Sequence, residues 1–364
     1  MNSLLRYLAA AALAISVALA GCATVPQPAP DEAAAAPAQG TPAPGTPSAP
    51  FRDRALEERL LALDPLRISD DDVRQVLAKG PTPRIMLFHG GIYPVHLLME
   101  SFGRFLSRMG YPEARIRDPG DGAWSYSPYE DAEKLAGIVA WDYETNGLHP
   151  MLIGHSQGGM QAVKVLHELA GHFDEAVRVY DPVREEFLDR TTIVDPLTHQ
   201  ERPVVGISVS YASATGAGGA TFLMPNQWSM LDKLESIPNT VDEFTGFSVG
   251  IDLIGGASRY RHNGTAKVRN VALPLNYNHI FVPAVGSLAQ EPEVRDWINT
   301  YAPGDTRDPS LLPGDAPQHV LWAADVWYSI KKHWCLEAQR WARAERAREA
   351  ATESKPPAVE RAAQ

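Results

Sequence analysis

Short apolar runs alternate along the middle of the chain with longer stretches in which apolar residues recur about every 3.6 positions, the helical period. The short runs predict strands at 84–88, 114–117, 150–154, 204–211, 247–252 and 267–273. The longer stretches predict helices at 96–109, 129–144, 158–170, 291–301 and about 318–345. Strands and helices that alternate in this way are typical of an α/β fold with a mostly parallel sheet.

Two stretches interrupt the alternation, at 171–203 and at 216–246, and we expect both to be insertions. Residues 191–199 have the pattern of a hairpin, and a helix is expected around 228–234. Residues 216–225 join glycines to large apolar side chains, so the part from 213 to 234 is expected to form a lid, an acyl pocket or an ordinary packing segment.

The two ends of the chain differ from the middle. Residues 23–50 contain eight prolines and almost no large apolar side chain, so they predict an extended tether. The folded domain is expected at 51–350. A flexible tail is expected at 351–364, where Lys355-Pro356-Pro357 stops any helix.

Residues 1–22 have the pattern of a bacterial export signal. One cation at Arg6 precedes an apolar run at 7–20, which is short for a membrane span. Leu19-Ala20-Gly21-Cys22 resembles the lipobox of bacterial lipoproteins, which implies that Cys22 becomes the acylated first residue of the mature chain. An ordinary signal peptide with an incidental cysteine is the alternative. The following residue, Ala23, is not the Asp that holds many lipoproteins at the inner membrane, so the resemblance implies the outer membrane.

Composition and charge narrow the function classes. The 364 residues are 45% hydrophobic and 21% charged, as in globular proteins. The net charge is −11 and no block of basic residues is present, which argues against a nucleic-acid partner. If Cys22 carries lipid, Cys335 is the remaining cysteine, so we expect no internal disulfide and a buried, inert thiol.

The motif that carries chemistry is Gly154-His155-Ser156-Gln157-Gly158-Gly159, between a predicted strand and a predicted helix. G-x-S-x-G in this context is the pattern of a nucleophile elbow, a tight turn that presents a serine hydroxyl. The glycines avoid collisions with neighbouring backbone. The helix that follows directs amide N–H groups toward developing negative charge.

Residues 85 to about 170 resemble the bacterial lipase and esterase branch of the α/β-hydrolase superfamily, which implies an α/β-hydrolase fold. His89-Gly90-Gly91 is similar to that family's His-Gly loop. The resemblance implies that the amides of Gly91 and Gln157 form an oxyanion hole, with Ile92 replacing Gly91 if the loop is shifted by one residue.

The same resemblance implies a chain order of serine, acid and histidine. His279 follows the last predicted strand, where the family places its base, whereas the other later histidines are expected at the surface or in packing. Asp252 ends the strand at 247–252 and is the expected acid. Asp242 and Glu243, just before that strand, are the alternatives.

We expect no metal and no cofactor. The loop at 117–125 resembles a Gly-rich loop of these hydrolases, but its two carboxylates, Asp118 and Asp121, are too few for a calcium site. No H-E-x-x-H or paired C-x-x-C pattern suggests another metal.

These features together predict a lipid-anchored serine hydrolase of the cell envelope that acts on a small ester or a lipid. A thioesterase, amidase or transacylase uses the same residues, and a non-catalytic lipoprotein that binds through a hydrolase fold is a further alternative. The sequence leaves the preferred acyl chain and the oligomeric state open.

Overall fold

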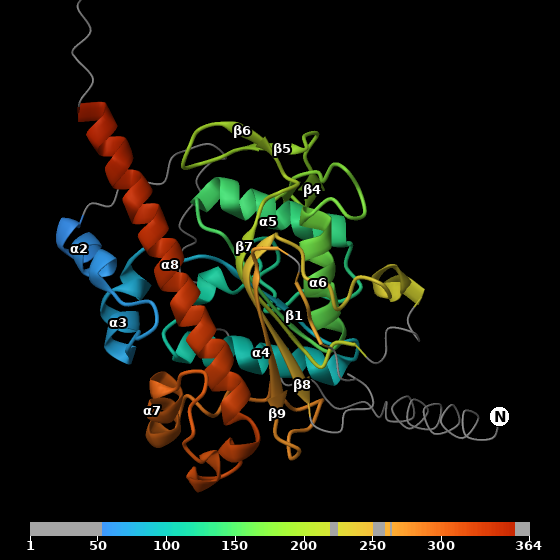
Figure 1. The fold of residues 1–364 in the computed structure, drawn as a ribbon, viewed down its shortest axis with the longest axis vertical. Coiled ribbons are helices and arrows are strands. Elements are labelled where there is room, and N and C mark those ends of the chain that lie inside the picture. Colours follow the sequence, from blue (N-terminus) through green and yellow to red (C-terminus); the bar gives the residue numbers. More distant parts are fainter. Residues whose placement is uncertain (1–52, 219–224, 250–258, 263, 354–364) are drawn as a thin grey trace, which may run out of the picture. The chain divides into compact units, whose positions relative to one another are not determined.

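The computed structural model describes residues 53–218, 225–249, 259–262 and 264–353 (Figure 1). The expected signal peptide with Cys22, and the expected tether, lie outside the described residues. No helix in the described part of the chain is long and apolar enough to cross a membrane.

Five strands form one sheet in the order β1-β2-β7-β8-β9, and every neighbouring pair is parallel. The strands are β1 (Ile85–Phe88), β2 (Met151–His155), β7 (Val209–Thr215), β8 (Val241–Val249) and β9 (Lys267–Leu273). The sheet confirms the predicted α/β class. Because all five strands run the same way, their carboxyl ends meet at one edge, where ligands of open α/β sheets bind.

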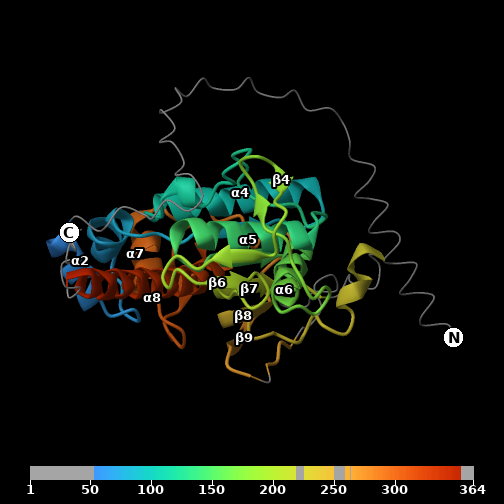
Figure 2. The ribbon, with the colours of Figure 1, turned by 90° about the horizontal axis from the view of Figure 1, so that it is seen from above.

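Helices cover both faces of the sheet (Figures 1 and 2). The α-helices are α2 (Arg54–Ala62), α3 (Asp70–Gln75), α4 (Tyr93–Arg108), α5 (Ala132–Asn146), α6 (Gln157–Leu169), α7 (Pro292–Thr300) and α8 (Val320–Glu353). The 3-10 helices in the described residues are η1 (Leu77–Lys79), η2 (Glu113–Arg115), η4 (Pro225–Met230), η5 (Pro309–Leu311) and η6 (Ala316–Gln318).

Alternate residues of β1 point into two separate cores. Ile85 and Leu87 pack with side chains of α2, α3, α4, α7 and α8, whereas Met86 and Phe88 pack with α5 and α6. This period of two is what a parallel strand buried on both faces requires. The long helix α8, red in Figure 1, completes the first of the two cores.

The inserted segment at 171–203 forms two small hairpins that lie over α5 in Figures 1 and 2. One pairs β3 (Tyr180–Asp181) with β4 (Glu186–Phe187), and the other pairs β5 (Thr192–Val194) with β6 (Glu201–Pro203). The second hairpin confirms the one expected around 191–199. The helix expected around 228–234 is found only in part: the 3-10 helix η4 covers 225–230, and hydrogen-bonded turns follow it up to Leu234.

The strand predicted at 114–117 is wrong: this segment contains η2. Pro112 is extended and precedes η2, and the backbone N–H groups of Ile116 and Arg117 both donate to the Glu113 carbonyl, which closes a helical turn. No strand from 114–117 pairs with β1. Next to β1 lies Tyr126, which forms an isolated parallel bridge with Phe88.

The largest other differences from the predicted bounds are in β7, β8 and α8. β7 begins at Val209 rather than 204, and β8 begins at Val241 rather than 247. Helix α8 continues to Glu353, past the expected end at 345 and into the start of the expected tail.

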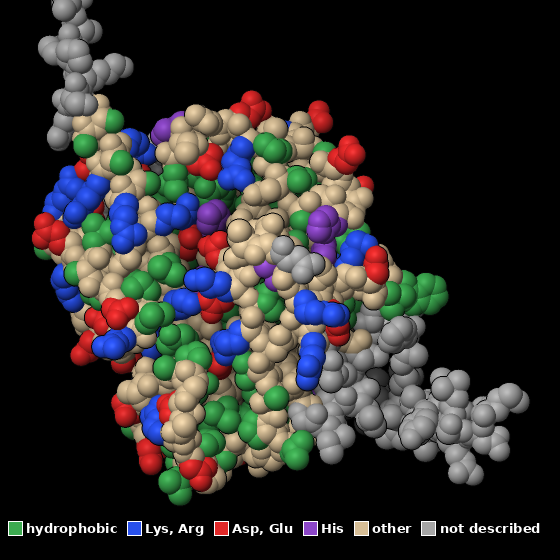
Figure 3. Space-filling model, in the orientation of Figure 1, with side chains coloured by type: hydrophobic (Ala, Val, Ile, Leu, Met, Phe, Trp, Pro, Cys, Tyr) green, Lys and Arg blue, Asp and Glu red, His purple; other side chains and the backbone are tan. Residues whose placement is uncertain are grey.

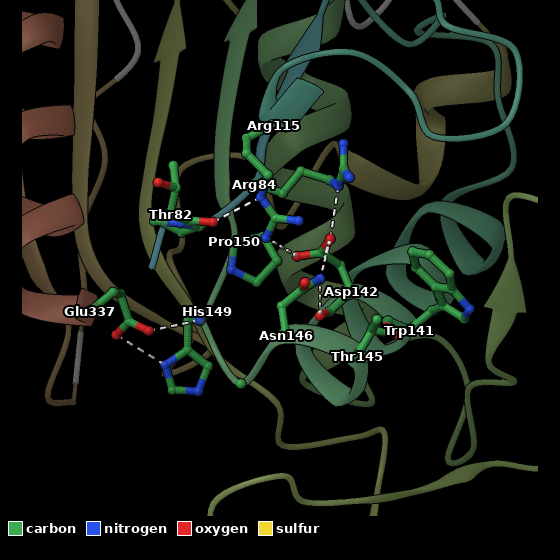
Figure 4. Close-up of polar contacts among 12 residues, drawn as sticks. Thr82, Arg84, Arg115, Trp141, Asp142, Thr145, Asn146, His149, Pro150 and Glu337 are labelled. Carbon is green, nitrogen blue, oxygen red and sulfur yellow. Dashed lines mark hydrogen bonds and ion pairs between the residues drawn. The ribbon is translucent and has the colours of Figure 1, made fainter. Parts of the chain in front are cut away.

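A buried polar cluster holds together the amino ends of β1 and β2 (Figure 4). The Arg84 guanidinium donates from Nε to Oδ1 of Asp142 at 2.8 Å, and both side chains are buried. The backbone N–H of His149 donates to Glu337 of α8 at 2.7 Å. These contacts tie α5, the sheet and α8 together at the edge opposite the carboxyl ends of the strands.

Charged side chains of both signs are interspersed on the face shown in Figure 3. Among the described residues many charged side chains form ion pairs, such as Arg190 with Glu144 and Arg269 with the buried Asp325. On that face, no large patch of a single sign stands out.

Candidate active site

Ser156 follows β2 at the carboxyl edge of the sheet and immediately precedes α6. Its backbone has φ 55° and ψ −126°, a conformation that glycine adopts freely and other residues rarely adopt. The Ser156 N–H donates to the Thr215 carbonyl at 2.7 Å, which ties the turn to the end of β7. The indole N–H of Trp322 in turn donates to the Thr215 hydroxyl at 2.9 Å. The strained turn is therefore held from two neighbouring elements.

The glycines of the motif are required by close approaches of the backbone. A Cβ added at Gly154 would lie 2.3 Å from the Gly158 carbonyl oxygen. One added at Gly158 would lie 2.3 Å from the Phe88 carbonyl oxygen at the end of β1. Neither position has room for a side chain, so this spacing of glycines allows α6 to start against β1 and β2.

His279 meets Ser156 across this edge. Nε2 of His279 lies 2.9 Å from Oγ of Ser156, within hydrogen-bond distance. His279 belongs to the segment after β9, as expected from the sequence, and the Tyr277 hydroxyl accepts a hydrogen bond from the backbone of Leu321 at 2.9 Å. The segment that carries the imidazole is therefore fixed to the start of α8.

His155 forms a second link between the turn and the histidine. Its Nε2 lies 2.7 Å from the backbone carbonyl of His279, and its side chain is buried. Because a carbonyl oxygen only accepts, Nε2 of His155 is the donor. His155 thus holds the backbone of His279, and the imidazole of His279 in turn contacts Ser156.

Of the three candidates for the acid that orients His279, the structure describes two. Asp252 lies outside the described residues. Its alternatives, Asp242 and Glu243, lie near the amino end of β8, and six residues separate Glu243 from Val249 at the carboxyl end. At about 3.3 Å per residue this is roughly 20 Å. Both alternatives therefore lie away from the edge where Ser156 and His279 meet.

Glu243 is engaged by α8. It forms an ion pair with Lys332, and Nε2 of His333 lies 3.5 Å from its carboxylate. Burial alone would raise the pKa of Glu243, but the hydrogen bonds and charges of His333 and Lys332 outweigh it and lower that pKa to about 2. Burial raises the pKa of the neighbouring Asp242.

The loop expected to supply an oxyanion donor packs on the turn. A Cβ added at Gly90 would lie 3.1 Å from Cβ of Ser156, and one added at Gly91 would lie 1.7 Å from Oε1 of Gln157. Gln157 is the first residue of α6, so its amide N–H has no partner within the helix. Ile92 immediately precedes α4 and is half exposed. Assignment of the oxyanion amides to Gly91 and Gln157 stays a prediction.

The later histidines other than His279 have other surroundings in the described residues. His167 and His172 contact each other through their Nδ1 atoms at 2.7 Å, and burial lowers the pKa of His167 to about 4. His262 contacts the Ile237 carbonyl at 2.6 Å. None of these contacts involves Ser156.

The described residues contain no group of three or more His, Cys, Asp or Glu side chains placed to hold a metal ion. The two loop carboxylates, Asp118 and Asp121, accept backbone N–H groups of their own loop. Cys335 is buried, and burial raises its pKa to about 12. Part of the segment at 213–234 lies outside the described residues, and its Trp228 is 55% exposed.

No protein-family model matches the chain, and no curated protein matches it at a significant level. Among solved structures, the chain is similar to RedJ with a polyethylene glycol molecule bound in the active site. The identity is 17% and the TM-score is 0.30, over 61% of this chain and 91% of that one. A similarity of this size implies nothing about activity.

Sequence reasoning missed the residues that hold the turn. Thr215 ends β7 and Trp322 lies in α8, far apart in sequence, and no local pattern links them to Ser156. His155 stands inside the motif, but its contact with the His279 carbonyl depends on how the two segments fold together. No signal in a single sequence would have revealed that contact.

Proposed function

We propose that the protein is a serine hydrolase that cleaves carboxylic esters, with Ser156 as nucleophile and His279 as general base. The observation that carries the proposal is the 2.9 Å contact between Ser156 Oγ and His279 Nε2 on a positive-φ turn between a parallel strand and a helix. A nucleophile within hydrogen-bond distance of an imidazole is the arrangement that acyl transfer through serine requires.

In the proposed reaction, Ser156 Oγ attacks the ester carbonyl carbon and its proton passes to His279 Nε2. The tetrahedral oxyanion accepts hydrogen bonds from the amides of Gln157 and Gly91, each contributing about 3 to 4 kcal/mol. Collapse expels the alcohol, which takes the proton from His279. Water then attacks the acyl-enzyme by the same route and releases the acid.

Asp252 is the proposed acid that orients the imidazole. Its two alternatives lie near the amino end of β8, and Glu243 already pairs with Lys332. Asp252→Asn is therefore expected to lower kcat strongly, whereas Asp242→Asn is expected to leave kcat close to that of the parent protein. A larger loss in Asp242→Asn than in Asp252→Asn would contradict this assignment.

We propose that the enzyme is anchored to the cell envelope, at the outer membrane, by lipid on Cys22, with residues 23–50 as the tether. The substrate would then be an ester or lipid within reach of that membrane. Mass spectrometry of the mature N-terminus tests the anchor, because a lipid-modified cysteine and a plain cleaved terminus differ in mass.

The decisive experiment is covalent labelling with a fluorophosphonate probe. The parent protein is expected to be labelled, and Ser156→Ala is expected to remain unlabelled while its circular dichroism spectrum shows a folded chain. A parent protein that resists the probe would favour a binding lipoprotein without activity. Hydrolysis of p-nitrophenyl esters from short to long acyl chains, alongside a thioester and a peptide amide, then separates an esterase from the other acyl hydrolases.

A further inference from the structure

A cleft of about 310 Å³ borders His89 and lies among segments that the proposed reaction does not use. Its walls are the loop at 118–127, the first turns of α5 and the turn between β3 and β4. The loop and the turn are in direct contact, because a Cβ added at Gly120 would lie 2.1 Å from the Pro182 carbonyl oxygen. This volume lies at the lower end of the range for small-molecule sites.

The cleft is lined by an excess of carboxylates. Asp118, Asp121 and Glu185 line it together with one ion pair, in which Lys134 lies 2.8 Å from Glu130. Backbone N–H groups orient two of the carboxylates, since Asp118 accepts from Gly120 at 2.7 Å and Asp121 accepts from Ala123 at 2.8 Å. The lining therefore keeps three negative charges that its own ammonium group does not balance.

Neighbouring basic groups cancel only part of this charge. Arg84 lies behind the wall, near Asp118, and shares the Asp142 carboxylate with Arg115. The two guanidinium groups and the Asp142 carboxylate leave one positive charge in excess against the three carboxylates of the lining. Burial lowers the pKa of His89, so its ring is neutral at pH 7. The cleft as a whole favours a cation.

Two buried hydroxyl groups in the same wall lack partners. Ser125 and Tyr126 are each 8% exposed, and neither hydroxyl has a hydrogen-bond partner among the described residues. Burial raises the pKa of Tyr126, and the nearby Asp118 carboxylate raises it further. Buried polar groups are nearly always satisfied by protein, water or ligand, so this pair marks a place for a polar partner.

We propose that this cleft binds a small amino alcohol. The ammonium group lies among Asp118, Asp121 and Glu185, the hydroxyl satisfies Ser125 or Tyr126, and the methylene stem packs on the apolar part of the wall. A bare metal ion is a poorer occupant, because the described residues form no cluster of ligands for one. The site does not depend on Ser156 acting as a nucleophile.

Isothermal titration of the full chain at pH 7 and low salt tests the proposal with three probes of equal length. 6-Aminohexan-1-ol is expected to bind, whereas 1,6-hexanediol and 6-hydroxyhexanoate are expected to bind at least tenfold more weakly. Asp118→Asn keeps an oxygen for the loop N–H groups but removes the charge, so it is expected to weaken binding of the amine at least tenfold. Asp232→Asn, which removes an exposed carboxylate that does not line the cleft, is the matched control and is expected to leave the affinity unchanged.

Tyr126→Phe removes one hydroxyl with almost no change of shape. It is expected to weaken binding of 6-aminohexan-1-ol while the thermal midpoint stays the same or rises, because the hydroxyl has no partner to lose. Three results would overturn the proposal. They are equal affinity for the diol and the amine, tighter binding of the carboxylate than of the amine, and an amine affinity that is unchanged in both Asp118→Asn and Tyr126→Phe. Ser156→Ala is expected to bind the amine normally, so loss of labelling at Ser156 and loss of binding here are separate results.

Discussion

Replacement of Ser156 by glycine and by alanine measures the strain in the turn. Both variants lose the hydroxyl and its contact with His279. The difference between their free energies of unfolding therefore reports only the effect of the backbone conformation at position 156. Alanine keeps the Cβ that makes φ 55°, ψ −126° unfavourable, whereas glycine adopts this conformation freely.

The magnitude follows from two opposing effects. A side chain held in a sparsely populated region costs about 1 to 3 kcal/mol, which glycine relieves. Glycine also makes the unfolded chain freer, which costs about 0.5 to 1 kcal/mol. The Ser156→Gly variant is therefore expected to be more stable than Ser156→Ala by about 0.5 to 2 kcal/mol.

Urea unfolding followed by circular dichroism gives the free energy of unfolding of each variant. The control is Ala347→Gly, at an exposed position within helix α8, where glycine is expected to lower stability by about 1 kcal/mol. Replacing alanine by glycine is thus expected to raise the free energy of unfolding at position 156 and to lower it at position 347. If Ser156→Gly is less stable than Ser156→Ala, the turn is not strained and the reasoning from its backbone angles fails.

Three further predictions concern the surroundings of the turn. Gly158→Ala places a Cβ 2.3 Å from the Phe88 carbonyl oxygen, so it is expected to lower the free energy of unfolding by about 1 to 3 kcal/mol and to reduce fluorophosphonate labelling; unchanged urea midpoints would contradict this. His155→Ala removes the hydrogen bond to the His279 carbonyl, so kcat for a p-nitrophenyl ester is expected to fall on the order of tenfold to a hundredfold with little change in KM, and a change in KM alone would contradict a positioning role. Burial raises the pKa of Glu168 to about 7, above its ordinary value, so its ionisation opposes folding as pH rises from about 4.5 to 7. Glu168→Gln is therefore expected to gain about 1 to 2 kcal/mol at pH 8, after allowance for solvent screening, and nothing at pH 4; equal urea midpoints at pH 8 would contradict it.

The sequence predicts the centre of this fold better than its edges. β1, β2 and α6 are short or strongly periodic apolar segments bounded by glycine or proline, and local pattern determines them. The elbow was recognisable because glycine spacing, strand and helix all occur within 150–170. The contact of His279 with Ser156 joins residues far apart in sequence, and only the resemblance to a hydrolase family, which places a histidine after the last predicted strand, suggested it.

The misplaced elements have tertiary causes. β8 begins at Val241, but Asp242 and Glu243 follow at once. Two adjacent charged residues interrupt the apolar pattern from which a strand is predicted. The partner that neutralises Glu243 is Lys332, which comes from α8. The unpartnered hydroxyls of Ser125 and Tyr126 are likewise invisible in sequence, because their isolation depends on the packing around them.

Helix α8 also determines when folding can finish. Three tryptophans of this helix, Trp322, Trp327 and Trp334, are among the largest fully buried side chains of the described chain. Because this helix follows every described strand in the chain, the apolar face of β1 and β2, which α4 covers in part, is completed only when α8 packs on it. The core between α4, the sheet and α8 therefore closes last, when the carboxyl-terminal part of the described chain has been made.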